Sequence, residues 1–283
     1  MLIDPAEEFM GTILILAPHM DDEVLACGGV IHLLPHRERI HVVYATDGMK
    51  SPAPIVPWRD SITPDLGDIR MAESRSAMEY LGVPVANTHF LKLPEAELNK
   101  NLQALNDLLF QEIEEINPDH ILMPFRFDRH PDHLAINHVV TAAYEQGHFP
   151  RANLYEYFVY HRWRLLPKKD IRHYISPQYL LEVNTEDVAA EKRAALNCFK
   201  SQTTKFYSWQ TRSILTPMLL DEESQQPEYF LRYDPSAAGG AVFSDSVTWI
   251  RIAHRLEPFL QKSKYRVGAF LYRKFGINGS WSS

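Results

Sequence analysis

Apolar positions in the first half of the chain alternate between short continuous runs and longer stretches with helical spacing. Continuous runs of four to eight apolar residues between polar segments indicate buried strands, and apolar positions three and four apart indicate amphipathic helices. The runs begin near residues 12, 40, 88 and 120, and the helical stretches cover about 24–35, 68–81, 98–116 and 133–146. Strands that alternate with helices in this way favour right-handed β-α-β units. We therefore predict an α/β fold with a Rossmann-like, mostly parallel sheet and helices on both faces.

The second half of the chain has a less regular pattern. Residues 153–161 and 178–183 predict strands, and residues 185–202 predict a helix with Thr185 as its N-cap. An aromatic-rich, proline-punctuated region follows, and a helix is expected from about Ser246 to Lys262. No linker separates the halves, so we predict one domain over residues 1–283, with a core of about residues 12–202 and a C-terminal elaboration at 203–283.

Composition excludes several classes of protein. The chain has 283 residues, 45% of them hydrophobic, and a formal net charge of −7, which speaks against a nucleic-acid partner because phosphate backbones are held by clustered Lys and Arg. Two cysteines are too few for a disulfide scaffold. No apolar stretch is long enough to span a membrane, and the acidic N-terminus lacks the basic start of a signal peptide. We expect a cytoplasmic protein.

The segment "APHMDDEVLACGG", residues 17–29, places three carboxylates and a histidine directly after the first strand. His19, Asp21, Asp22 and Glu23 lie within five residues, where the carboxylates repel one another unless a positive charge lies among them. A metal ion is the simplest such charge.

A second polar segment, "RFDRHPDH" at residues 126–133, follows the strand that begins near residue 120. Ligands of open α/β sheets bind at the carboxyl ends of the strands, so we expect His130, Asp132 and His133 to meet the first segment at one edge of the sheet. Two histidines and one aspartate, with a position left for water, are typical of a catalytic zinc site.

These segments identify a resemblance. "PHMDDE" followed by "HPDH", with "TDG" at residues 46–48, "RMAESRSAMEYLG" at 70–82 and "KRAALNCFKSQ" at 192–202, resembles the PIG-L/LmbE-like family of zinc-dependent de-N-acetylases. The resemblance covers about residues 12–202. It implies a Zn²⁺ cofactor and hydrolysis of an N-acetyl or other N-acyl group on an amino-sugar-containing small molecule or glycoconjugate. A homo-oligomer is an open expectation.

The family pattern also implies roles for seven residues. It makes His19, Asp22 and His133 the metal ligands, Asp21 the general base, His130 (oriented by Asp132) the group that stabilises the oxyanion and protonates the amine, and Arg70 a substrate-binding residue. Such a base depends on the metal, because zinc lowers the pKa of bound water from about 15.7 to about 7.

Three positions depart from the family pattern. Met20 replaces the usual proline, Phe199 stands where many relatives have histidine, and Asp128 stands where some relatives carry an active-site tyrosine. The last difference leaves oxyanion stabilisation by a tyrosine in doubt.

Other interpretations remain open from the sequence. Asp22 or Glu23 alone could cap the following helix. His19, Asp21 and His133 also match the ligand set of the facial triad of a non-haem iron oxygenase. Within the family, an amidase of a sugar-thiol conjugate is the nearest rival. The sequence does not select the acyl amide, and we expect specificity to come from residues 49–67 and from the region beyond Gln202.

Overall fold

A seven-stranded sheet forms the centre of the protein. The computed structural model describes residues 1–53, 63–234, 242–243 and 248–256. The strand order is β3-β2-β1-β4-β5-β7-β6, and the first five strands of that order are parallel whereas β7 is antiparallel to both of its neighbours. The strands are β1 (Ile13–Ala17), β2 (Ile40–Thr46), β3 (Thr88–Leu93), β4 (His120–Pro124), β5 (Asn153–Tyr157), β6 (Leu180–Val183) and β7 (Glu228–Arg232). The predicted α/β fold with a mostly parallel sheet is confirmed.

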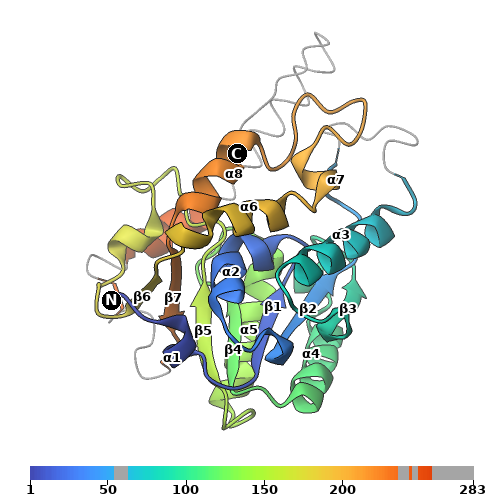
Figure 1. Cartoon of the computed structure of the whole chain (residues 1–283). Helices are drawn as coiled ribbons and strands as arrows, with labels where there is room; N and C mark the ends of the chain where they lie inside the picture. The colour runs from blue at the N-terminus through green and yellow to red at the C-terminus, as the bar shows by residue number, and fades with distance from the viewer. Residues whose placement is uncertain (54–62, 235–241, 244–247, 257–283) are drawn as a thin grey trace.

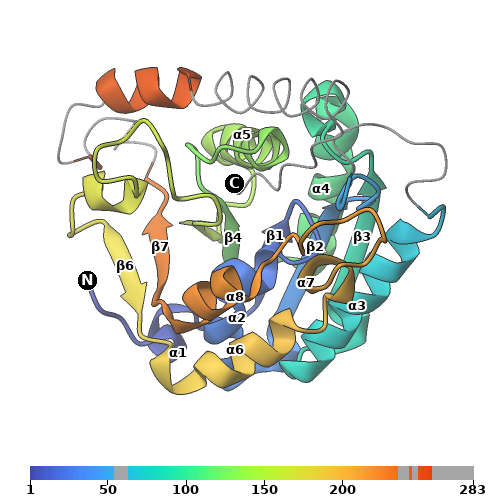
Figure 2. The same ribbon diagram turned by 90° about the horizontal axis from the view of Figure 1, so that it is seen from above.

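Helices cover both faces of the sheet (Figures 1 and 2). On one face lie α2 (Asp22–Leu33), α3 (Leu66–Tyr80) and α6 (Ala189–Leu196), and on the other lie α4 (Leu102–Ile116) and α5 (Pro131–Glu145). All five residues of β1 and of β4 are buried, as expected for strands that are covered on both faces. Leu105, Leu109 and Ile113 form the buried stripe of α4, which ends at Asn117 in the left-handed conformation.

The predicted strands and helices of the first half agree with the structure within a few residues. The single helix predicted for residues 185–202 is wrong. This region instead contains a short 3₁₀ turn (Glu186–Val188), α6, and the four-residue α7 (Lys200–Thr203). Thr185 does not cap a helix with its side chain, because its hydroxyl donates to the carbonyl oxygen of Gln226 at 3.0 Å.

Part of the expected C-terminal elaboration belongs to the central sheet. Strand β7 lies between β5 and β6, and α8 (Pro217–Gln225) precedes it. Residues 248–256 are helical, whereas the rest of the helix expected from Ser246 to Lys262 falls outside the described residues. This helix packs through Ile250 and Ala253 on an aromatic cluster that includes Trp163. None of the described helices has the length and apolar character needed to cross a membrane.

Candidate metal and catalytic site

Two loops at the carboxyl edge of the sheet bring the polar segments together. The first follows β1 and leads into α2, and the second follows β4 and leads into α5. Strands β1 and β4 are parallel neighbours, so the two loops leave the sheet side by side (Figure 1). His130 caps α5, since its Nδ1 accepts the backbone N–H of Asp132 at 3.2 Å and Pro131 occupies the first helical position.

Three side-chain atoms form a nearly equilateral triangle. Oδ2 of Asp22 lies 3.1 Å from Nδ1 of His19 and 3.1 Å from Nε2 of His133, and the two ring nitrogens are 3.3 Å apart. Ligands 2.0–2.1 Å from a tetrahedral zinc ion are separated by roughly 3.3 Å. The three residues are almost completely buried. Their geometry therefore fits three ligands of one divalent cation.

His130 offers a fourth donor near the triangle. One ring nitrogen from each of His19, His130 and His133 lies within 4.8 Å of the others, so these three histidines form a second candidate ligand set among the described residues. The distances between the three atoms of the set with Asp22 are closer to the roughly 3.3 Å expected between two ligands of a tetrahedral zinc ion. In that set, both imidazoles also lie next to an anionic oxygen. We take His19, Asp22 and His133 as the first candidate set for this reason.

A further carboxylate lies behind each of the two imidazoles. Oδ2 of Asp132 is 3.1 Å from Nε2 of His19, and Oδ2 of Asp128 is 3.2 Å from Nδ1 of His133. Metal-binding histidines usually present their second nitrogen to such a carboxylate, which fixes the ring orientation and increases the basicity of the ligand. Asp132 contacts His130 through its backbone N–H, whereas its carboxylate oxygen lies 3.9 Å from Nδ1 of His130 and does not form a hydrogen bond to it.

Carboxylates stabilise positive charge within the triangle. Burial alone lowers the pKa of His19, but hydrogen bonds to Asp132 and Asp22 raise it to about 9. Burial acts in the same direction on His133, and the carboxylates of Asp128 and Asp22 raise its pKa to about 10. Burial raises the pKa of Asp22, whereas His133 and His19 lower it well below its usual range. Both imidazoles therefore carry a positive charge at neutral pH, and a cation that binds here must displace one proton from each.

Asp21 lies at the edge of the triangle in an uncommon backbone conformation. Its φ angle is 139°, and its Oδ1 lies 3.8 Å from Nη2 of Arg70. Burial raises the pKa of Asp21, Arg70 opposes the shift, and the neighbouring Asp22 and Glu95 add to it, with a result of about 7. A buried carboxyl group with a pKa near neutrality suits general acid–base catalysis.

Glu23 holds the backbone of Asp21. Its Oε2 accepts the N–H of Asp21 at 3.0 Å, and its Oε1 accepts the hydroxyl of Tyr44 at 2.9 Å. Glu23 is completely buried, and burial followed by the charge of Asp21 raises its pKa to about 8. The carboxylate therefore supports the strained residue beside it, which distinguishes it from a simple helix cap.

Arg70 is enclosed by protein atoms. It is 1% exposed, it donates to the carbonyl oxygens of Met20 at 2.9 Å and Gly48 at 3.4 Å, and its Nη1 lies 3.6 Å from Glu95. This placement brings its guanidinium within 3.8 Å of the carboxylate of Asp21. The positive charge of Arg70 therefore acts on the pKa of Asp21.

The protonated, charged form of His130 is unfavourable in this site. Burial, followed by the positive charges of His19 and His133, lowers the pKa of His130 to about 3, although Asp132 opposes the shift. The neighbouring carboxylate of Asp132 is thus not sufficient to keep His130 in its charged form. Since Nδ1 accepts a backbone N–H, the neutral ring carries its proton on Nε2.

Sequence reasoning missed three neighbours of the site. Asp128 stood out only as a departure from the family pattern, and Glu95 and Tyr160 were not predicted to lie there. Tyr160 lies alongside the imidazoles, with ring centroids 5.3 Å from His133 and 6.1 Å from His130. It follows β5, so the signal that could have found it was its position just beyond the carboxyl end of a predicted strand.

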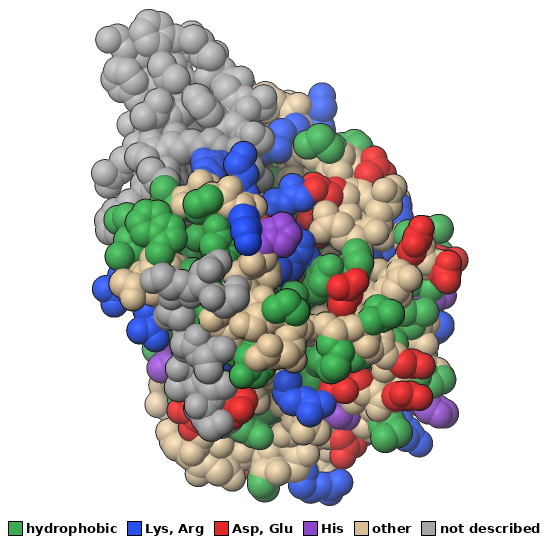
Figure 3. All heavy atoms as spheres, turned by 90° about the vertical axis from the view of Figure 1, so that its left-hand side faces the viewer, with side chains coloured by type: hydrophobic (Ala, Val, Ile, Leu, Met, Phe, Trp, Pro, Cys, Tyr) green, Lys and Arg blue, Asp and Glu red, His purple; other side chains and the backbone are tan. Residues whose placement is uncertain are grey.

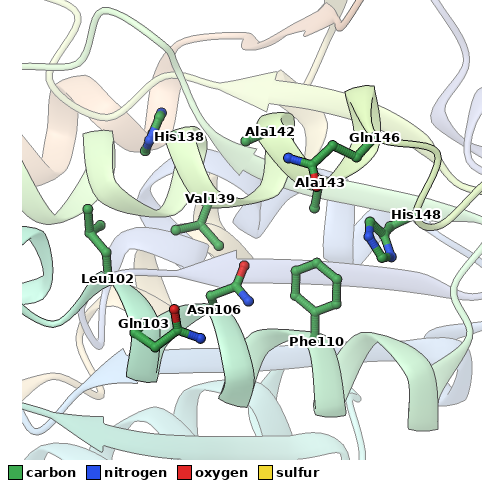
Figure 4. Close-up of a pocket in the computed structure, with 10 residues that line it drawn as sticks. All are labelled: Leu102, Gln103, Asn106, Phe110, His138, Val139, Ala142, Ala143, Gln146 and His148. Carbon is green, nitrogen blue, oxygen red and sulfur yellow. The ribbon is translucent and has the colours of Figure 1, made fainter.

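A groove of about 440 Å³ lies elsewhere, between α4 and α5 (Figure 4). Phe110 and His148 face it from opposite sides, and their ring centroids are 4.9 Å apart. None of the site residues described above lines this groove. It is therefore separate from the chemistry at the triangle.

A family comparison matches the region that holds these loops. Residues 14–144 match the PIG-L family model, which is described as GlcNAc-PI de-N-acetylase. This part of the chain is therefore similar to the PIG-L family. The matched region contains every candidate ligand and catalytic residue named from the sequence, so the predicted family resemblance is confirmed. No curated protein matches the chain in a sequence comparison.

Solved structures share the fold. N,N'-diacetylchitobiose deacetylase from Pyrococcus horikoshii is 17% identical with a TM-score of 0.60, and the match covers 81% of this chain and 86% of that one. The zinc-inhibited form of teicoplanin deacetylase Orf2 is 16% identical with a TM-score of 0.52, covering 79% and 99%. GalB, the 4-carboxy-2-hydroxymuconate hydratase of Pseudomonas putida KT2440, is 18% identical with a TM-score of 0.52, covering 80% and 97%. At these identities the likeness concerns the fold alone.

Proposed function

We propose that this protein is a metal-dependent hydrolase that removes an N-acetyl or other N-acyl group from an amino-sugar-containing small molecule or glycoconjugate. The observation that carries the proposal is the triangle of His19, Asp22 and His133 beside a carboxyl group, Asp21, whose pKa is about 7. A cation held by three protein ligands keeps an open position for water and substrate.

The bound cation would supply Lewis acidity, which polarises the acyl oxygen and lowers the pKa of water. Asp21 takes the proton from the attacking water and passes it to the departing nitrogen. A pKa near neutrality allows both transfers. The products are a carboxylic acid and a free amine, so atoms and charge balance without a further reactant.

The remaining residues orient these groups. Glu23 and Arg70 hold the backbone and the carboxylate of Asp21, respectively. Asp132 and Asp128 hold the imidazoles of the ligands. His130, in its neutral form, is suited to donate the Nε2 proton in a hydrogen bond to the oxyanion. We propose this in place of protonation of the amine by a charged His130.

Several observations support a deacylase over its rivals. The matching family is described as a de-N-acetylase, and two of the proteins that share the fold are named as deacetylases. A facial triad would need Asp21 between the imidazoles, and Asp22 has that position. A hydratase shares the fold as well, so the reaction must be tested on its products.

The test is release of acetate together with a free amine. Purified protein loaded with Zn²⁺, or with other divalent ions in parallel, is incubated with N-acetylglucosamine-containing substrates and with N-acyl sugar-thiol conjugates. We expect one new amine for each acetate, and no activity after chelation. Hydration of a double bond without amine release would instead favour a hydratase. Amine release from the thiol conjugates alone would favour the amidase.

A further inference from the structure

The helix at residues 248–256 turns large apolar side chains toward solvent. Trp249 is 49% exposed, Ile252 42% and Leu256 49%, and their spacing places them along one side of the helix. Ile250 and Ala253, on the inner side, are 1% exposed and pack on the protein. A helix on the surface of a soluble protein normally exposes its polar side. We call Trp249, Ile252 and Leu256 the apolar stripe.

Arginines flank the apolar stripe. Arg251 and Arg255 are one helical turn apart, and both are exposed. Figure 3 shows one side of the molecule, on which Lys and Arg side chains lie beside hydrophobic ones. The sequence around these two arginines is also basic, because residues 248–283 contain seven of the 29 Lys and Arg residues and only one of the 36 acidic residues. The chain as a whole is acidic, with a formal net charge of −7, whereas seven basic residues and one acidic residue give this segment a formal net charge of +6.

The helix is fixed to the candidate site. Nε2 of His254 lies 2.9 Å from the carbonyl oxygen of Asp128, and the imidazole packs against Phe127 and Trp163 with centroid distances of 5.4 Å. Asp128 belongs to the loop that leads into α5, and its carboxylate lies 3.2 Å from Nδ1 of His133. A surface that holds this helix would therefore also hold the loop of the site.

We propose that the helix at residues 248–256 binds the surface of a membrane that contains anionic lipid. The apolar stripe enters the interface, and Arg251 and Arg255 face the lipid phosphates. An interfacial helix combines these two features, because a lipid surface offers both acyl chains and negative charge. A nucleic acid would pair with the arginines but leave the apolar stripe in water. An apolar protein groove would cover the stripe but leave the arginines unpaired.

This proposal does not depend on the proposed hydrolysis, because the experiment measures binding. The full chain is floated with vesicles of equal parts phosphatidylcholine and phosphatidylglycerol, and with vesicles of phosphatidylcholine alone. We expect binding to the anionic vesicles that weakens as NaCl is added. Binding to neither kind of vesicle, or a shift of a DNA duplex at the same salt without vesicle binding, overturns the proposal.

Two surface variants and one matched control locate the binding. The double change Arg251→Glu and Arg255→Glu should lower the partition coefficient by at least about 25-fold, because each basic residue near an anionic membrane contributes about fivefold. Trp249→Ser with Ile252→Ser should also release the protein. Arg39→Glu with Arg75→Glu, which makes the same change in charge at exposed positions elsewhere, should bind nearly as wild type does. Equal losses in the arginine variant and the control contradict the proposal, and thermal melting shows whether each variant is folded.

Discussion

Oδ2 of Asp132 lies 3.1 Å from Nε2 of His19. The same carboxylate accepts the backbone N–H groups of Ala96 and Leu98, at 2.6 and 3.0 Å, so its position is fixed from the loop after β3 as well as from α5. The residue that the sequence associates with His130 thus supports a candidate metal ligand. This relationship changes what is expected of its variants.

We expect Asp132→Asn to weaken metal binding. Loss of an outer carboxylate typically lowers metal affinity by about 10–100-fold. Asp128→Asn, which alters the equivalent partner of His133, should have an effect of similar size. Titration with Zn²⁺ against a competing chelator measures both. An unchanged affinity for Zn²⁺ with a lower kcat would instead show that Asp132 acts through His130.

Substitutions of the adjacent Asp21 and Asp22 should have different effects. Asp22→Ala and His133→Ala should lose stoichiometric metal, since each removes one corner of the triangle. Asp21→Asn should retain metal and lose about 10²–10⁴-fold in kcat, because it removes the proposed general base. Elemental analysis and kinetics on the same preparations give both values. If Asp21→Asn loses the metal and Asp22→Ala keeps it, the facial-triad interpretation is correct.

Glu23 should act through the backbone of Asp21. Glu23→Ala removes the acceptor of the Asp21 N–H, so we expect kcat to fall by about tenfold or more while metal stoichiometry is kept. Glu23→Gln is the matched control, because its amide oxygen still accepts that N–H and its amide nitrogen can donate to the hydroxyl oxygen of Tyr44. Recovery of kcat in Glu23→Gln separates positioning from the negative charge. Equal loss in both variants would contradict the proposed role.

Metal binding should release protons. The pKa values of about 9 for His19 and about 10 for His133 mean that both rings are protonated at pH 7 in the metal-free protein. A ligand nitrogen must lose its proton, so binding one cation at pH 7 should release about two protons, and affinity should rise with pH until about 9–10. Calorimetry in two buffers of different ionisation enthalpy counts the protons. Fewer than one released proton would show that the imidazoles are already neutral.

His130→Ala should keep the metal and lower kcat by about 10²–10³-fold through loss of an oxyanion donor. Because the pKa of His130 is lowered to about 3, its titration does not contribute to the alkaline limb of the pH–rate profile. The variant should therefore retain that limb. Loss of the alkaline limb would instead identify His130 as the acid that protonates the amine.

The sequence by itself determined the frame of the site. Short apolar runs and helical spacing are local properties, so β1, β4 and α5 were predictable within a few residues. Parallel strands place their carboxyl ends on one edge, and this rule predicts that the segment around His19 meets the segment around His133. The candidate ligands follow from these two facts and from the family resemblance.

Only the tertiary structure decided how the carboxylates are distributed. Asp132 is two residues from His130 in sequence, but the chain turns into α5 between them, and its carboxylate faces His19 instead. Strand β7 was missed for a related reason. It pairs antiparallel with β5 and β6, which lie far earlier in the chain, so its partners are absent from the local pattern. Side-chain direction and long-range pairing depend on packing between distant segments, which no local pattern of residues contains.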